Sequence, residues 1–171
     1  ITNLIGVKIS TKKIDKMVAA VIDSNDKILN SFYESLPFDL TNAQIRVIKE
    51  IQADIKKSKP MRRLVQGDVG SGKTLVAAGA ILTCAKNNLQ SVLLCPTEVL
   101  AEQHFKNFST WFANENVDIA ILTGKTKKKE WEKIDENLRS GKVKVLIGTH
   151  SIFQERVSMK NLSLVVVDEQ Q

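Results

Sequence analysis

One eight-residue stretch constrains the fold of this chain more than any other feature. Residues 67–74 are Gly-Asp-Val-Gly-Ser-Gly-Lys-Thr, which matches the G-x-x-x-x-G-K-T pattern of a phosphate-binding loop. The short apolar run Leu64-Val65 precedes it and predicts a buried parallel strand, and the apolar stretch from Leu75 to Leu82 predicts a buried helix. Strand, loop and helix in this order are the structural context in which the pattern binds phosphate.

The residue types in this loop suit a phosphate ligand. Glycines let the backbone wrap closely around an anion, and the N–H groups of the loop and of the following helix N-terminus point toward it. Lys73 is expected to contact the β- and γ-phosphates, and Thr74 to offer a hydroxyl to Mg²⁺. A chance glycine-rich turn is the alternative, but all four key positions and both flanks match the pattern. The predicted nucleotide-binding residues of the loop are Gly67, Asp68, Gly70, Ser71, Gly72, Lys73 and Thr74.

A second motif follows an apolar run near the end of the chain. Leu164 to Val167 is followed by Asp168 and Glu169. A phosphate-loop site needs a carboxylate near its metal, at the end of a neighbouring strand, so Asp168 is the predicted partner of Mg²⁺ and its water shell. Glu169 is the candidate to position or deprotonate the attacking water; two acids that merely close a strand are the alternative. The predicted catalytic residues are Lys73, Asp168 and Glu169, and the predicted Mg²⁺ residues are Thr74 and Asp168.

Composition narrows the class without choosing the ligand. A hydrophobic fraction of 43% in 171 residues is enough for one domain with a real core. The net charge of +6 is compatible with a polyanion partner, but it does not distinguish nucleic acid, membrane and nucleotide. Cys84 and Cys95 lie in apolar runs, which predicts buried free thiols and a reducing, cytoplasmic location. No apolar run approaches membrane-spanning length.

Strand-like and helix-like segments alternate along most of the chain, which predicts an α/β fold with a parallel sheet and helices on both faces. In such a sheet the ligand binds outside the carboxyl ends of the strands, and every motif-bearing segment follows a predicted strand. Thr41 and Thr97 are predicted N-caps, and Val99 is expected on the apolar face of the helix after Thr97. The expected strands are 92–95, 117–122, 143–147 and 162–167, and the other expected helices are 12–22, 27–36 and 127–138.

The domain organisation predicted from the sequence has two parts. Residues 1–36 carry no motif and are expected to form a helical linker, while residues 37–171 are expected to form the nucleotide-binding domain. Pro37 marks the boundary because proline ends the preceding helix. The chain begins at Ile1 without Met and stops at Gln171 directly after an apolar strand, so we expect it to be part of a larger protein.

Six stretches occur in a single order along the chain: PFDLTNAQ, LVQGDVGSGKT, CPTEVLAEQH, LTGK, IGTHSIFQE and VVVDEQ. From about Leu36 to its end, the chain closely resembles the first motor domain of the RecG family of bacterial ATP-dependent DNA helicases, which are superfamily 2 enzymes. The resemblance implies a RecA-like P-loop domain. It also implies an enzyme that uses ATP and Mg²⁺ to remodel branched DNA, such as replication forks and Holliday junctions, in recombination and repair.

The resemblance further implies roles for individual residues. Gln44 would read the adenine, because its amide offers both a donor and an acceptor, and Phe38 would pack on the base. Amides, hydroxyls and lysines at strand ends would grip DNA phosphates without reading bases. Each has a structural alternative: Thr97 is a good helix cap, the glycines suit turns, and a lysine run suits a solvated face. The implied DNA-contacting residues are Pro96, Thr97, Glu98, Thr123, Gly124, Lys125, Gly148, Thr149 and His150.

Two other interpretations stay open at this stage. One is the motor domain of a transcription-repair coupling factor, although Glu98, Glu102 and Gln170 match the RecG pattern better. The other is a P-loop nucleotide-binding module without motor activity, against which the DNA-side motifs argue. Gln171 departs from the family, which has a histidine there; glutamine forms hydrogen bonds but cannot take a proton. RecG-type enzymes also need a second motor domain and an upstream wedge domain, so these 171 residues alone are not expected to unwind DNA.

Overall fold

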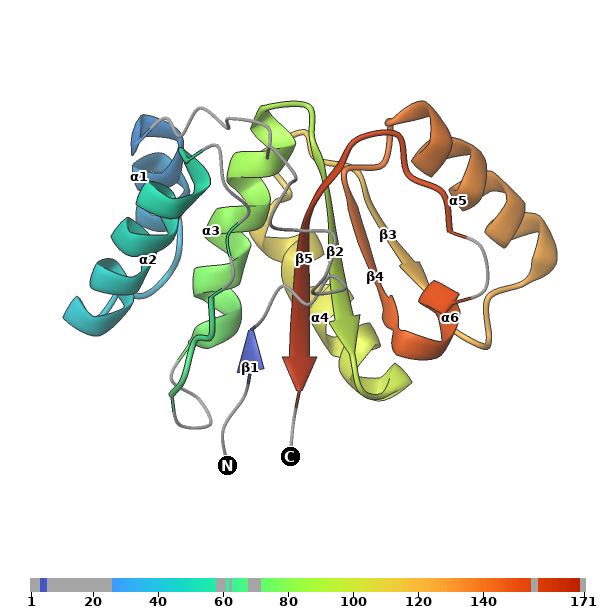
Figure 1. Cartoon of the computed structure of the whole chain (residues 1–171), viewed down its shortest axis with the longest axis horizontal. Helices are drawn as coiled ribbons and strands as arrows, with labels where there is room; N and C mark the ends of the chain where they lie inside the picture. The colour runs from blue at the N-terminus through green and yellow to red at the C-terminus, as the bar shows by residue number, and fades with distance from the viewer. Residues whose placement is uncertain are drawn as a thin grey trace.

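A parallel sheet forms the centre of the molecule (Figure 1). The computed structural model describes residues 4–5, 26–57, 61, 63–67, 72–154 and 157–169. A short strand at one edge, β1 (Leu4–Ile5), pairs antiparallel with the neighbouring strand β5. The remaining neighbours pair in parallel, which confirms the predicted fold class. From β1 the order continues through β5 (Leu162–Glu169), β2 (Gln90–Cys95), β4 (Val145–Thr149) and β3 (Ile119–Leu122).

Helices cover both faces of the sheet because successive strand residues point to opposite sides. Leu93 and Cys95 of β2 join a large apolar cluster with four helices, while Val92 and Leu94 join a second cluster on the other face. The helices on the first face are α1 (Asp26–Glu34), α2 (Asn42–Ile55), α3 (Lys73–Lys86) and α4 (Glu98–Trp111). Those on the second face are α5 (Lys128–Ser140) and α6 (His150–Gln154).

Local sequence signals account for where several helices begin and end. The Thr41 side chain accepts a hydrogen bond from the Gln44 backbone N–H, and the Gln44 side chain accepts one from Thr41 N–H at 2.8 Å, which is a complete capping box at the start of α2. Thr97 caps α4 through the Leu100 N–H at 3.2 Å. Gly141 ends α5 with φ of 81°, a left-handed conformation that glycine adopts without strain. The two predicted N-caps, Thr41 and Thr97, are confirmed.

Helix α1 packs into the core although the sequence places it in a linker. Phe32 is fully buried and its ring centroid lies 5.5 Å from that of Phe112. The Tyr33 hydroxyl donates to the Leu75 carbonyl of α3 at 3.2 Å. Burial raises the pKa of this phenol, although a hydrogen bond with the Gly79 backbone acts to lower it. The helix expected at 27–36 is therefore confirmed, and it rests on the helix that follows the phosphate loop. The helix expected at 12–22 lies outside the described residues.

Replacing Gly79 by alanine is expected to lower the free energy of unfolding by up to about 2 kcal/mol. An added Cβ would overlap the Tyr33 hydroxyl and lie 3.0 Å from its Cζ, and such overpacking destabilises by about 1–3 kcal/mol. This loss exceeds the gain of about 1 kcal/mol in helix propensity. Urea unfolding of Gly79→Ala, Tyr33→Phe and the double variant measures the coupling. Additive effects in the double variant would contradict the close contact between α1 and α3.

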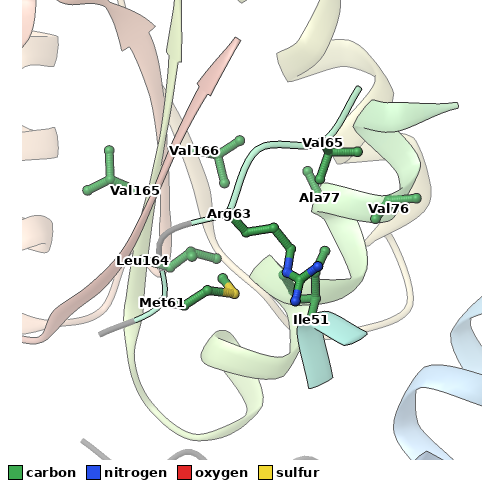
Figure 2. Close-up of a pocket in the computed structure, with 10 residues that line it drawn as sticks. Ile51, Met61, Arg63, Val65, Val76, Ala77, Leu164, Val165 and Val166 are labelled. Atoms are coloured by element: carbon green, nitrogen blue, oxygen red, sulfur yellow. The ribbon is translucent and has the colours of Figure 1, made fainter. Parts of the chain in front are cut away.

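The segment that leads into the phosphate loop differs from the prediction. Val65 is buried in a single bridge position, but Leu64 is 47% exposed, so the pair does not form a strand buried on both sides. Figure 2 shows Val65 facing Val76 and Ala77 of α3, beside a cavity of about 20 Å³ that β5 closes on the opposite side. Packing against one helix explains the alternation, because neighbouring side chains of an extended segment point in opposite directions.

An arginine anchors this same segment to α2. Arg63 donates to Asp54 Oδ2 from two nitrogens, at 2.9 and 2.6 Å, and to Glu50 Oε2 at 2.6 Å. Partial burial acts to raise the pKa of Asp54, but the hydrogen bonds from Lys57 and Arg63 outweigh it and hold the pKa below its usual value. The sequence offered no motif for this arginine, and its partners show that it fixes the approach to the phosphate loop.

Two further differences concern exposure and helix content. Val99, expected on the buried face of α4, lies in the first turn of that helix and is 72% exposed. The short helix α6 was not predicted, since its five residues are too few to show a helical period. The described helices include none that is long and apolar enough to cross a membrane.

Candidate functional site

The predicted phosphate loop leads into the start of α3. Gly72 precedes the helix with φ of 75°, and Lys73 opens it with a side chain that is largely buried. The Lys73 ammonium donates to the carbonyl of Gly67, the first residue of the predicted loop. The N-terminus of the helix adds its N–H groups and its dipole at the same place. Asp68, Gly70 and Ser71 lie outside the described residues, and their predicted contacts stay predictions.

Asp168 lies next to this loop although almost a hundred residues separate them in sequence. In the sheet, Val167 of β5 pairs with Leu94 of β2, which brings the end of β5 beside the start of α3. A cavity with room for about one water molecule lies between them. Its lining consists of Lys73, Thr74, Ala77, Leu93, His104, Val166 and Asp168.

The residue set at this cavity fits a magnesium ion bound together with a nucleotide. The Thr74 hydroxyl and the Asp168 carboxylate are oxygen donors, which Mg²⁺ prefers. The described residues contain no group of three or more His, Cys, Asp or Glu side chains that could hold a metal by themselves. Mg²⁺ at a nucleotide site takes one or two protein oxygens and completes its shell with phosphates and water, and Thr74 and Asp168 could supply those two oxygens. The side chain of Glu169, the predicted water-positioning residue, lies outside what the structure describes.

Gln44 meets the phosphate loop directly. A Cβ added to Gly72 would overlap the Gln44 Nε2 atom, so a glycine is required there both for its positive φ and for this close approach. The Gln44 Oε1 atom is also the capping acceptor for Thr41 N–H, and a carbonyl oxygen has a second lone pair for another donor. Phe38, the other predicted base-contacting residue, is 48% exposed. The fold thus places the predicted adenine-reading residue against the predicted phosphate loop.

The buried pair formed by His104 and Asp168 was missed from the sequence. The His104 Nε2 atom lies 2.7 Å from Asp168 Oδ2, and the two side chains are 9% and 12% exposed. His104 belongs to the stretch CPTEVLAEQH, but a histidine two turns into a helix carries no signal for a partner 64 residues away. Its orientation into the site depends on how α4 crosses the sheet.

The two cysteines are buried free thiols, as predicted. Burial raises the pKa of Cys84 to about 12, against a small opposing effect of the Ser91 hydroxyl. Burial also raises the pKa of Cys95 to about 12, and the negative charge of Asp168 adds to the effect. Cys95 therefore lies close to the acidic end of β5.

The predicted DNA-contacting segments meet at the same edge of the sheet, beside the nucleotide site (Figure 1). Cys95, the last residue of β2, pairs with Thr149, and Leu122, the last residue of β3, pairs with Gly148. The loops that follow β2, β3 and β4 are therefore neighbours. Their exposed residues include Pro96, Thr97, Gly124, Lys125 and His150.

Hydrogen bonds hold these loops in shape. The Glu98 Oε1 atom accepts from Gly124 N–H at 2.6 Å, which joins the start of α4 to the turn after β3. The Thr123 hydroxyl, which is buried, accepts from Lys125 N–H at 3.3 Å within that turn. The Glu98 carboxylate thus fixes the shape of the turn that follows β3. Whether Glu98 and Thr123 also touch DNA stays a prediction.

The end of β4 has a mixed character. A Cβ added to Gly148 would lie 3.0 Å from the Leu122 carbonyl oxygen, so this glycine permits close approach of β3 and β4. The Thr149 hydroxyl lies 3.1 Å from that of Ser151, and Thr149 is buried. His150, at the first position of α6, is exposed. Of these three residues, His150 has the accessibility that a nucleic-acid contact needs in this structure.

Comparison with known proteins places the chain among helicases. The family model for DEAD/DEAH box helicases matches residues 41–171. The chain therefore belongs to the DEAD/DEAH box helicase family, and its fold and its phosphate-loop site agree with that class.

Its similar relatives are proteins named ATP-dependent DNA helicase RecG, which confirms the resemblance. The protein of Escherichia coli K12 is 48% identical over 152 residues, covering 89% of this chain and 22% of the relative. That of Aquifex aeolicus is 40% identical over 166 residues, covering 97% of this chain and 21% of the relative. This chain thus spans about a fifth of the length of these relatives.

Solved structures agree with this assignment. A structure of RecG bound to a three-way DNA junction superposes with a TM-score of 0.85 at 45% identity, covering 90% of this chain and 21% of that one. A hypothetical ATP-dependent RNA helicase from Sulfolobus tokodaii gives a TM-score of 0.55 at 19% identity, covering 77% and 36%, and shows the fold alone.

Proposed function

We propose that this chain is the ATP-binding first motor domain of a RecG-type DNA helicase, and that the full-length protein couples ATP hydrolysis to the remodelling of branched DNA. The observation that carries the proposal is the gathering of Gln44, Lys73, Thr74 and Asp168 around the start of α3. Residues 37–171 form the motor domain, and α1 packs against it through Phe32 and Tyr33. The junction-bound RecG structure supports branched DNA as the substrate.

The residues of this site divide the chemistry of ATP hydrolysis among them. Lys73 and the N-terminus of α3 neutralise the β- and γ-phosphates, while Gln44 recognises the base. Thr74 and Asp168 would hold Mg²⁺, which would screen the phosphate charge when bound. Glu169 orients that water. Phosphoryl transfer is catalysed mostly by positioning and charge neutralisation, and the placing of Lys73, Thr74 and Asp168 around one cavity supports these roles.

The loops after β2, β3 and β4 form the DNA-facing part of the domain. Thr97, Lys125 and His150 offer a hydroxyl, an ammonium group and an imidazole N–H, which contact phosphate without reading base sequence. Such contacts suit a motor that moves along any sequence. They also predict that DNA binding weakens steeply with salt, because phosphate contacts release counterions.

Gln44 variants of the full-length protein test the nucleotide assignment. Gln44→Ala is expected to reduce the preference for ATP over GTP by about tenfold or more, because an unmatched polar base edge costs about 1–3 kcal/mol. Gln44→Glu is the matched control, since glutamate retains the capping acceptor for Thr41 N–H but lacks the amide donor. If the role is adenine recognition, both variants lose the preference while Gln44→Glu keeps the stability of α2.

The measurement is ATP and GTP hydrolysis with and without forked DNA, together with a thermal melt. A variant Gln44→Ala that keeps the wild-type ATP preference would exclude base reading and leave only the helix cap. DNA binding that is insensitive to salt, or hydrolysis that forked DNA does not stimulate, would contradict the motor function.

A further inference from the structure

The buried contact between His104 and Asp168 joins helix α4 to strand β5. His104 is on α4, whose first turn lies at the DNA-facing edge, and Asp168 is near the end of β5, at the nucleotide site. Their atoms Nε2 and Oδ2 are 2.7 Å apart in a nearly solvent-free environment. Short hydrogen bonds to an ionised acceptor are among the stronger contacts in proteins, so this pair restrains both side chains.

The chemistry of the pair determines the direction of the hydrogen bond. An ionised carboxylate only accepts hydrogen bonds, so the imidazole Nε2–H group is the donor and Asp168 Oδ2 is the acceptor. The other ring nitrogen, His104 Nδ1, is buried and has no hydrogen-bond partner within the described part of the chain. Among the described residues, the imidazole therefore forms its side-chain hydrogen bond with Asp168 alone, through Nε2.

This arrangement resembles the support that metal-binding carboxylates receive from a second layer of residues. With Oδ2 held by the histidine, Asp168 has its other oxygen, Oδ1, to turn toward Mg²⁺ or a water bound to it. Both side chains line the small cavity beside Lys73 and Thr74. Outer partners of this kind orient the ligand, and their loss lowers metal affinity or activity about 10–100-fold.

The position of His104 along α4 adds a connection to the other half of the site. Glu98, in the first turn of α4, holds the Gly124 turn through its carboxylate. Between Glu98 and His104 the helix rises about 9 Å. A single rigid helix therefore contacts the DNA-facing turn at one point and the acidic end of β5 at another.

We propose that His104 is a positioning residue for Asp168: it holds the carboxylate in the orientation that Mg²⁺-nucleotide binding requires and ties it to α4. The proposal rests on the function proposed above and adds a residue to it. A histidine with only a structural role in the core would contribute to folding but would not change the magnesium requirement.

Two isosteric variants of the full-length protein test the proposal. In His104→Gln the amide nitrogen can occupy the place of Nε2 and donate to Asp168, whereas in His104→Asn the amide is too short to reach it. We expect His104→Gln to resemble the wild type, and His104→Asn to need about tenfold more Mg²⁺ for half-maximal binding of a fluorescent ADP analogue and for half-maximal ATP hydrolysis. Ser109→Ala, an exposed substitution on the same helix, should leave both midpoints unchanged.

Each result decides the question. Equal magnesium midpoints for His104→Asn, His104→Gln and the wild type would overturn the proposal. An Asn variant that fails to fold while the Gln variant folds would assign the pair to stability alone and overturn it as well. The Lys73→Ala variant distinguishes a failure of this proposal from a failure of the proposed function. If Lys73→Ala still hydrolyses ATP, the proposed function is wrong. If Lys73→Ala loses ATP hydrolysis but His104→Asn keeps the wild-type magnesium midpoints, only the positioning role of His104 is wrong.

Discussion

Replacing Lys73 by alanine is expected to lower ATP hydrolysis by the full-length protein by about 10²–10³-fold, the effect of removing one preorganised group that stabilises charge in a transition state. The Lys73 side chain is 8% exposed and donates to the Gly67 carbonyl. In the proposed function, its ammonium group neutralises negative charge on the phosphates. The cavity that it lines also contains Thr74 and Asp168.

The control for this prediction is Lys86→Ala at the other end of the same helix. Lys86 pairs with Glu115 at 3.1 Å, and such a pair near the surface contributes about 1 kcal/mol or less to stability. Steady-state ATP hydrolysis at saturating DNA, with a thermal melt of each variant, gives the comparison. If Lys73→Ala hydrolyses ATP at the rate of Lys86→Ala, the phosphate-binding role assigned to Lys73 is wrong.

The substitution Gln90→Leu is expected to lower the free energy of unfolding by about 2–5 kcal/mol. Gln90 is fully buried at the start of β2. Its amide nitrogen donates to the Leu138 and Val143 carbonyls at 2.9 and 2.7 Å, and its carbonyl accepts from Asn161 N–H at 2.8 Å. Leucine is similar in size but satisfies none of these groups, and buried polar groups without partners are the source of the loss.

The three hydrogen-bond partners of the Gln90 side chain do not lose the same amount of free energy in this variant. The Leu138 carbonyl also accepts from Gly141 N–H at 3.2 Å and from Lys160 N–H at 3.3 Å, so the larger penalties fall on Val143 and Asn161. Urea unfolding measures the change, with Gln103→Leu on the exposed side of α4 as the matched control, expected within about 0.5 kcal/mol of the wild type. A Gln90→Leu variant as stable as that control would show that the hydrogen bonds of Gln90 contribute nothing net.

Several parts of the fold could be predicted because their causes are local. A threonine followed three residues later by a glutamine forms the capping box of α2, and Gly141 ends α5 with a conformation that few other residues adopt. The start of α3 follows from the glycine-lysine-threonine spacing. Such signals lie within one helical turn, so they can be recognised without knowing how the chain folds back on itself.

The prediction failed where exposure depends on tertiary neighbours. Leu64 and Val65 are both apolar, but α3 covers Val65 and leaves Leu64 exposed. Val99 has the spacing of a core residue, but it lies in the first turn of α4 and is exposed. Apolar spacing predicts a face; it does not show how much of that face another element will cover.

The sequence by itself determined the class of fold, the phosphate loop and the acidic residues at the end of β5, because each is a contiguous pattern with a chemical meaning. Only the tertiary structure decided which distant residues meet: Gln44 against Gly72, Glu98 on the Gly124 turn, and His104 on Asp168. The physical reason is that a parallel sheet brings the carboxyl ends of strands together whatever their separation in sequence. The contacts that assemble the site therefore arise from strand order and helix crossing, which no local pattern specifies.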